Sequence, residues 1–206
     1  MNTTPVAFFD FDGTLTKSDT LLPFLKFVIG RPSFYIKLTK VSPVLIAYIA
    51  GVLRNDVAKE IVLQSFLSGY SLQELNEFGK RFSSEVIPKM LRAEGIDRLL
   101  WHKSQGHDCV LVSASLDVYL RYWARSFGFS GLLSTSLVFS SDGVTCGNLK
   151  GKNCYGDEKL RRVKEWLSDR CPSLIYAYGD TKGDMPLIKF SNNGWIWKKG
   201  RFVRIV

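Results

Sequence analysis

Two acidic residues follow an apolar run near the start of the chain. Residues 5–12 read PVAFFDFD, so a predicted buried strand delivers Asp10 and Asp12 at its carboxyl end, directly before Gly13 and Thr14. Side chains alternate across a strand, which places these two carboxylates on one side. Adjacent carboxylates repel each other unless a cation or a shared proton relieves the repulsion. The spacing therefore predicts a metal site at the end of this strand.

A second acidic pair follows another predicted strand near the other end of the chain. The strand is expected over residues 173–180 (SLIYAYGD), and the run GDTKGD supplies Asp180 and Asp184 with two glycines that permit a tight turn. Ligands bind at the carboxyl ends of the strands in open α/β sheets. We therefore expect acids from both ends of the chain to meet at one edge of the sheet.

Two residues between the acidic pairs suit an anionic ligand. Ser113 lies near the end of a predicted strand over residues 108–115, where its hydroxyl and the neighbouring amides, including that of Ala114, can hold a phosphate oxygen. Lys159 lies in the first turn of a predicted helix, where the helix dipole favours negative charge instead. Each signal is weak alone, because such serines are commonly turn residues and such lysines commonly solvated. Their order between the acidic pairs favours a phosphate site.

The elements that must position these residues alternate along the chain. No strand comparable to the first is predicted between Ser18 and Gly106, where helical spacing dominates and Ser71 and Glu74 form a candidate capping box. Further strands are expected at 108–115, 131–139, 173–180 and 193–198, helices at 116–127 and 157–169, and a hairpin around Asp142-Gly143. Strands that alternate with helices predict an α/β fold with a doubly wound parallel sheet. The helical segment is predicted to be an insertion after the first strand.

Composition limits the classes of function. The 206 residues are 46% apolar and 23% charged, which excludes a disordered or low-complexity chain. Subtracting 19 acidic from 28 basic side chains gives +9, a surplus that attracts nucleic acid, an acidic membrane face or phosphorylated small molecules. The four cysteines contain no CxxC pair, and neither a secretory signal nor a spanning apolar run is visible. We therefore expect a cytoplasmic protein with reduced thiols.

The order Asp-x-Asp, Ser, Lys and Gly-Asp-x-x-x-Asp resembles that of the haloacid dehalogenase superfamily, specifically its phosphoserine-phosphatase-like branch. The resemblance covers nearly the whole chain, and its first and fourth motifs are the strong ones. It implies a Rossmann-like catalytic core over residues 1–17 and 107–206, with an α-helical cap over residues 18–106. It also implies hydrolysis of phosphomonoesters with Mg²⁺ through an aspartyl-phosphate intermediate.

The resemblance also implies a role for each matching residue. Asp10 is the implied nucleophile and Asp12 the implied general acid and base. Mg²⁺ is implied to bind Asp10, Asp180 and the backbone carbonyl of Asp12. The residues implied to bind the phosphoryl group are Ser113, Ala114 and Lys159. Those implied to support the site are Gly13, Thr14 and Asp184.

The predicted insertion carries the information about the substrate. Residues 20–55 contain no acid but five basic side chains, together with two apolar pieces that flank the basic, aromatic connector RPSFYIKLTK. Two interpretations stay open: the pieces form a hairpin at an anionic membrane surface, such as the inner face of the cell membrane, or they pack within the cap. The pattern resembles bacterial phosphatidylglycerophosphatases of the same branch. Residues 21–27 offer no acid, whereas phosphoserine phosphatases carry a Glu there, so a lipid phosphate or a small soluble ester is expected instead of phosphoserine.

Three classes of function remain: a phosphomonoester hydrolase, a phosphotransferase that uses the same aspartyl-phosphate, and a basic nucleic-acid-binding protein. The hydrolase and the transferase share every motif above, so only acceptor competition separates them. The nucleic-acid alternative rests on charge and on residues 194–204 (GWIWKKGRFVR), where basic and aromatic residues mix. Such a terminal run is more typical of an edge strand with charged gatekeepers. We expect a phosphorylated substrate and no nucleic-acid partner.

Overall fold

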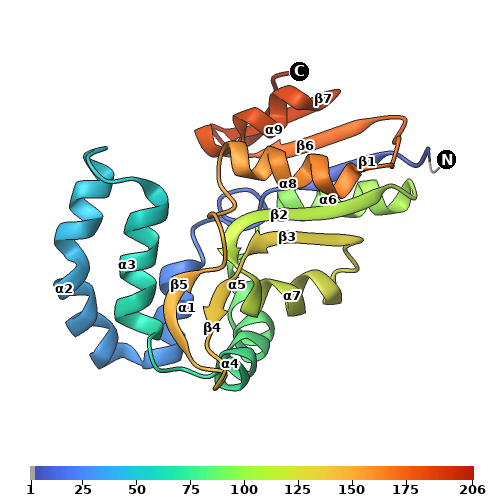
Figure 1. Ribbon diagram of the computed structural model, residues 1–206. Helices are drawn as coiled ribbons and strands as arrows, with labels where there is room; N and C mark the ends of the chain where they lie inside the picture. Colours follow the sequence, from blue (N-terminus) through green and yellow to red (C-terminus); the bar gives the residue numbers. More distant parts are fainter. Residues whose placement is uncertain (1–2) are drawn as a thin grey trace.

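A six-stranded sheet forms the centre of the structure, a computed structural model that describes residues 3–206 (Figure 1). Its strand order is β3-β2-β1-β6-β7-β8. The strands are β1 (Val6–Phe9), β2 (Asp108–Leu116), β3 (Gly131–Thr135), β6 (Ile175–Gly179), β7 (Asn193–Lys198) and β8 (Arg201–Arg204). All are parallel except β8, which runs antiparallel to β7. The predicted α/β class is confirmed, and β1, β2 and β6 end side by side at one edge.

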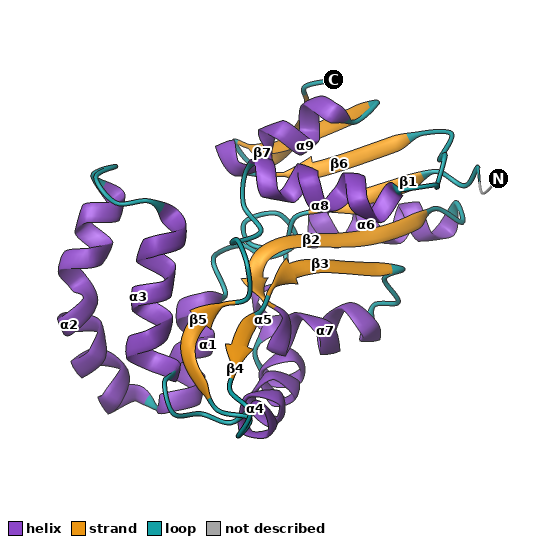
Figure 2. Ribbon diagram, viewed as in Figure 1, coloured by secondary structure: helices purple, strands orange, loops and turns teal. Residues whose placement is uncertain are grey.

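Helices cover both faces of the sheet (Figure 2). The four helices of the core are α6 (Ala93–Ser104), α7 (Asp117–Ser126), α8 (Asp157–Leu167) and α9 (Met185–Phe190). Val6 and Phe8 of β1 share a buried cluster with α8 and α9, whereas Ala7 and Phe9 belong to the cluster that includes α6 and α7. Both faces of β1 are therefore buried, which explains its continuous apolar sequence.

Five of the six helices between β1 and β2 stand beside the sheet, and α2 and α3 form a long antiparallel pair (Figure 1). They are α1 (Leu21–Ile29), α2 (Arg31–Ile49), α3 (Asn55–Leu67), α4 (Leu72–Glu85) and α5 (Ile87–Met90). The capping box of α4 is confirmed, because Ser71 N–H donates to Glu74 and the Ser71 hydroxyl accepts from Glu74 N–H. Within residues 3–206, no helix is both long and apolar enough to cross a membrane.

The single strand expected over residues 131–139 is two strands. After β3 the chain leaves the sheet at Ser136, and β4 (Leu137–Phe139) pairs with β5 (Thr145–Leu149) in a separate two-stranded sheet. The predicted turn at Gly143 is confirmed, since its N–H donates to the carbonyl of Ser140. The hairpin packs on α3, where the Leu149 N–H donates to Glu60. The expected strand is divided because β3 pairs with β2 in the main sheet, whereas the β4–β5 hairpin packs on the helical insertion.

The terminal aromatic and basic run forms the β7–β8 edge of the sheet. Two of its tryptophans contact arginine side chains. The guanidinium group of Arg92, directly before α6, lies 4.0 Å from the centre of the Trp197 ring, and the guanidinium group of Arg98, within α6, lies 5.2 Å from the centre of the Trp195 ring. These contacts give the aromatic residues a packing role within the chain.

We expect Gly79→Ala to destabilise the contact between α4 and α7. A Cβ at Gly79 would lie 1.9 Å from the carbonyl oxygen of Val118, which cannot move without displacing α7. The free energy of unfolding should fall by about 2–4 kcal/mol, as expected for overpacking of a buried contact. Urea denaturation measures the change, and Ser84→Ala, on the exposed side of α4, is the control. A Gly79→Ala protein as stable as the control would contradict this packing.

Candidate active site

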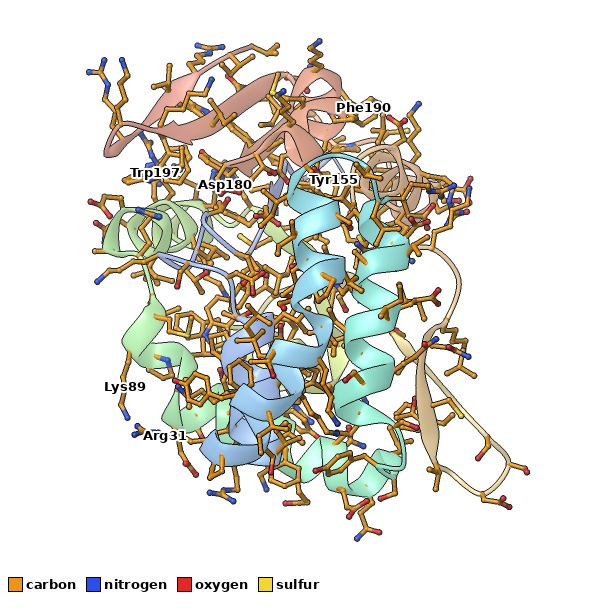
Figure 3. The ribbon with its side chains drawn as sticks, turned by 90° about the vertical axis from the view of Figure 1, so that its left-hand side faces the viewer. Arg31, Lys89, Tyr155, Asp180, Phe190 and Trp197 are labelled. Atoms are coloured by element: carbon orange, nitrogen blue, oxygen red, sulfur yellow. The ribbon has the colours of Figure 1, made fainter. Side chains whose placement is uncertain are left out.

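A pocket of about 340 Å³ lies between the carboxyl edge of the sheet and the helical insertion. Figure 3 shows Tyr155 beside the neighbouring ends of α2 and α3, with Asp180 nearby, and both residues line the pocket. Core residues along its wall include Asp10, Asp12, Ser113, Ala114, Lys159 and Asp180. The helices contribute Leu21, Leu22, Leu45, Tyr48, Ala58, Lys59 and Val62. The pocket thus has an acidic end on the sheet and a mainly apolar wall on the insertion.

Three of the predicted acids meet at the acidic end. Carboxylate oxygens of Asp10, Asp180 and Asp184 all lie within 4.8 Å of one another. The Lys159 ammonium group lies 2.5 Å from Asp10 Oδ1 and 2.6 Å from Asp184 Oδ1, and these three side chains are buried. The loop after β1, the end of β6 with the turn that follows it, and the first turn of α8 therefore meet here, and Asp10 and Lys159 alone are 149 positions apart along the chain.

The charges of this cluster do not balance. Burial raises the pKa of Asp10 well above its usual range, although Lys159 opposes this shift, and burial together with Asp184 raises the pKa of Asp180 to about 6. Burial opposes ionisation of Asp184 as well, but Lys159 and backbone N–H groups outweigh it and lower that pKa. When all are ionised, three carboxylates face one ammonium group. Carboxylate oxygens are the ligands that Mg²⁺ prefers, so this donor set fits a hard divalent cation.

The two residues that follow the acidic pair of the first motif shape the cluster. The Thr14 hydroxyl donates to Asp10 Oδ2 at 3.2 Å. Gly13 has a φ of 77°, and a Cβ there would lie 2.0 Å from Asp180 Oδ2. Only glycine combines this left-handed conformation with the close approach of Asp180. Both residues therefore lie against the acidic cluster.

Asp12 lines the same pocket but its carboxylate belongs to a different set of contacts. Asp12 Oδ1 accepts from the N–H (2.8 Å) and hydroxyl (2.6 Å) of Thr20, and Asp12 Oδ2 accepts from the hydroxyl of Ser115. Because β1 ends at Phe9, the alternation that predicted Asp10 and Asp12 on one side does not extend to them. Burial, with a smaller contribution from Asp19, raises the pKa of Asp12 to about 6, against the opposing hydrogen bonds.

Ser113 and Ala114 line the pocket at the end of β2. The Ser113 hydroxyl is buried and accepts from the N–H of Ser115 at 3.0 Å. The pairing of β2 with β3 shifts register after Ser113, so the backbone departs from regular strand geometry at this point. Both residues therefore lie on the wall of the pocket at the carboxyl end of β2.

Several pocket residues carry no signal in the sequence. They are Asn55, Lys59, Ser115, Asn153 and Tyr155, and Thr20, which binds Asp12 behind the pocket wall, carries none either. Ser115 and Asn153 lie within a few positions of predicted site residues, which is the only hint available for them. Lys59 comes from a helix of the insertion and reaches Ala114, 55 positions further along the chain, so no local pattern marks it.

Comparison with known proteins identifies the family. The sequence pattern of the haloacid dehalogenase-like hydrolases matches residues 7–189. The chain belongs to this family. Protein CicA of Caulobacter vibrioides is 33% identical over 184 residues, which are 89% of this chain and 82% of that protein. A Histidinol-phosphatase of Neisseria meningitidis serogroup C is 30% identical over 131 residues, 60% of this chain and 58% of its own.

A solved structure of a substrate-bound phosphoserine phosphatase has the same fold. It superposes with a TM-score of 0.69, covers 95% of this chain and 87% of its own, and is 16% identical in sequence. The phosphoserine-phosphatase-like fold is thereby confirmed. The family, the phosphatase relatives and the shared fold together show that this haloacid dehalogenase-like hydrolase is a phosphatase.

Proposed function

We propose that this chain hydrolyses phosphomonoesters with Mg²⁺ through an aspartyl-phosphate formed on Asp10. The observation that carries the proposal is the position of the buried Asp10 carboxylate, which lies at the end of the pocket beside Lys159, Asp180 and Asp184. Residues 1–17 and 107–206 would act as the catalytic core and residues 18–106 as its cap. Helix α6, although within that cap range, packs against β2 of the sheet.

The acidic cluster supports a metal ion in this proposal. Asp10, Asp180 and the backbone carbonyl of Asp12 would hold Mg²⁺, and Asp184 would orient Lys159. Bound there, Mg²⁺ supplies positive charge that offsets the negative charge gathering on the phosphoryl oxygens. Lys159, the Ser113 hydroxyl and the Ala114 amide would bind those oxygens on the protein side.

Asp10 and Asp12 divide the chemistry between them. An Asp10 carboxylate oxygen attacks phosphorus, the bond from phosphorus to the ester oxygen breaks, and the departing oxygen takes the proton of the Asp12 carboxyl group. Asp12 then takes a proton from water, whose oxygen attacks phosphorus and releases Asp10. A pKa near 6 suits this role, because Asp12 exchanges its proton readily near neutral pH. Thr20 and Ser115 hold the carboxyl group in place.

We expect chelation of divalent metal to abolish phosphate release. A panel of sugar, amino-acid, nucleotide and lipid phosphates, with p-nitrophenyl phosphate as a reference, tests the activity with Mg²⁺ and with EDTA. EDTA should lower turnover at least about 100-fold, since a bound metal supplies several kcal/mol of charge stabilisation. Mg²⁺ in excess of EDTA is the control and should restore the rate. Equal turnover with and without EDTA would contradict the metal-dependent mechanism, and transfer to an added alcohol in place of release would indicate a phosphotransferase.

The insertion supports an ester with an apolar portion. Leu21, Leu22, Leu45 and Val62 line the part of the pocket that the insertion forms. A lipid phosphate such as phosphatidylglycerophosphate would place its apolar part there, and a small soluble ester is the alternative. Turnover of soluble esters at least as fast as that of phosphatidylglycerophosphate in micelles would exclude the lipid substrate.

The outer side of α2 supports membrane contact through residues 20–55. Ile46, Ile49 and Val52 are 66%, 82% and 82% exposed, and this part of the chain contains basic residues but no acid. Exposed apolar side chains suit insertion into a lipid surface, and the basic residues on α1 and the first half of α2 favour an anionic one, although Arg54 itself pairs with Asp56. The same end of the helical pair carries Tyr48, which lines the pocket. A membrane in contact with this end would lie close to the pocket.

We expect the double substitution Ile49→Glu/Val52→Glu to weaken membrane binding. Affinity for phosphatidylglycerol-containing vesicles, measured by co-sedimentation, should fall about tenfold or more, because two apolar side chains are lost and two charges are repelled. Leu100→Glu, at an exposed position of α6, is the control for added charge. Equal binding of the double variant and the control would exclude this contact.

A further inference from the structure

One lysine of the helical insertion reaches the phosphate-binding part of the core. Lys59 of α3 donates to the carbonyl oxygen of Ala114 and, at 3.2 Å, to Asn153 Oδ1. Ala114 follows Ser113 at the end of β2, and Asn153 lies in the loop that leads to α8 and Lys159. A single side chain thus joins α3 to both core segments that carry the proposed phosphate ligands.

Asn153 is held in one orientation by several partners. Its Oδ1 also accepts from the Thr135 hydroxyl at 2.8 Å, while its Nδ2 donates to Asn55 Oδ1 at 2.5 Å. Asn55 and Lys59 are four residues apart on α3, so one face of that helix contacts both ends of the Asn153 amide. Because Asn153 is buried, loss of these partners would leave polar atoms unsatisfied.

The surroundings of Lys59 indicate that it serves to fix the positions of the core segments that it contacts. Lys59 is half-buried, and removing its ammonium group from solvent costs desolvation energy that an apolar side chain at this position would avoid. Burial lowers the pKa of Lys59 to about 8, Lys159 adds to the lowering, and Asp12, Asp19 and Cys154 oppose it. Both direct acceptors are neutral oxygens of the core, whose positions Lys59 fixes relative to α3.

We propose that Lys59 is a positioning residue, which holds the segments of Ser113–Ala114 and Asn153 in their phosphate-binding arrangement when α3 lies against the core. Contact between insertion and core then completes the phosphate site. This inference rests on the proposed phosphatase function, and it assigns the insertion a part in binding the phosphoryl group itself as well as the rest of the ester.

Calorimetric titration with inorganic phosphate in the presence of Mg²⁺ tests the inference, because phosphate has no leaving group. Lys59→Met keeps most of the apolar stem and removes the ammonium group. We expect it to bind phosphate about 10- to 100-fold more weakly than the wild type, the range for loss of a charge-assisted hydrogen-bond donor. The value of kcat/KM should fall by a similar factor for every ester tested. Lys80→Met, at an exposed position of α4, is the control and should bind phosphate normally.

A double-mutant cycle with Asn153→Ala separates positioning from direct binding. If Lys59 acts through the segment of Asn153, the double variant should lose little more phosphate affinity than Lys59→Met alone. Additive losses would overturn the inference. Unchanged phosphate affinity of Lys59→Met would also overturn it, even with slower turnover of particular esters, because Lys59 would then recognise the leaving group. If the wild type itself neither binds phosphate nor releases it from any ester, the result contradicts the proposed function and not only the role of Lys59.

The wild-type chain offers a second test should Lys59→Met not fold. Lys59 loses its charge as the pH rises through about 8, while the pKa of Lys159 is raised by Asp10 and Asp184 and that of the Cys154 thiol is raised by burial. Asp12, whose pKa is about 6, is ionised over this range. Phosphate affinity should therefore fall several-fold between about pH 7 and about pH 9. A constant affinity over this range would overturn the inference.

Discussion

Asp10→Asn should eliminate phosphate release, with kcat/KM at least about 10⁴-fold below the wild type. The amide keeps the size of the side chain and an oxygen that can accept from Thr14, but it cannot attack phosphorus. The fold should be retained, because Lys159 still pairs with Asp184. The substitution also removes one of three carboxylates that face a single ammonium group, which lowers their mutual repulsion. Steady-state kinetics and thermal unfolding measure the two effects.

Asp97→Asn is the matched control for Asp10→Asn. It removes one carboxylate from an exposed position of α6, away from the pocket at the sheet edge. Its activity should equal that of the wild type. Substantial activity of Asp10→Asn, with the control unaffected, would mean that another group receives the phosphoryl group.

Asp12→Asn should slow the reaction by an amount that depends on the leaving group. Loss of general acid and base catalysis costs about 10²- to 10⁴-fold. Nitrophenolate departs without a proton, so the variant should still form the intermediate from p-nitrophenyl phosphate. Attack of water on the aspartyl-phosphate would then lack its general base. We therefore expect a burst of one nitrophenolate per active site followed by slow turnover. Rapid-quench or stopped-flow absorbance measures the burst.

Alkyl phosphates provide the internal comparison for Asp12→Asn. Their leaving oxygen needs the proton, so the first step is slowed and no burst should be seen. Equal loss of rate for aryl and alkyl esters, without a burst for either, would show that Asp12 has a different role. Its contacts with Thr20 and Ser115 would then serve only the local structure.

The sequence predicts most of the sheet and the acidic cluster because the relevant patterns are local. The apolar run of β1, buried on both faces, and the Ser71 capping box of α4 are each determined by residues close together in the chain. The meeting of Asp10 with Asp180 follows from a general property of parallel sheets. These features need no knowledge of which distant side chains touch.

The remaining features depend on contacts between distant segments. Asp12 turns toward Thr20 and Ser115 because β1 ends three residues earlier, and strand ends are poorly defined by sequence patterns. The pairing of Lys59 with Asn153 joins positions 94 apart and leaves no periodic signal. The separation of β4 from β3 reflects the packing of the hairpin on α3, which no residue of the strand itself encodes.

Chemical trapping of the intermediate tests the central claim most directly. An aspartyl-phosphate is an acyl phosphate, and borohydride reduces the acyl carbon to an alcohol, which converts the aspartate into homoserine. We expect peptide mass spectrometry to find homoserine at position 10 when the wild-type enzyme is quenched with borohydride during turnover, and none when substrate is omitted. Homoserine at Asp12, Asp180 or Asp184 instead, or at no position during rapid turnover, would contradict the account.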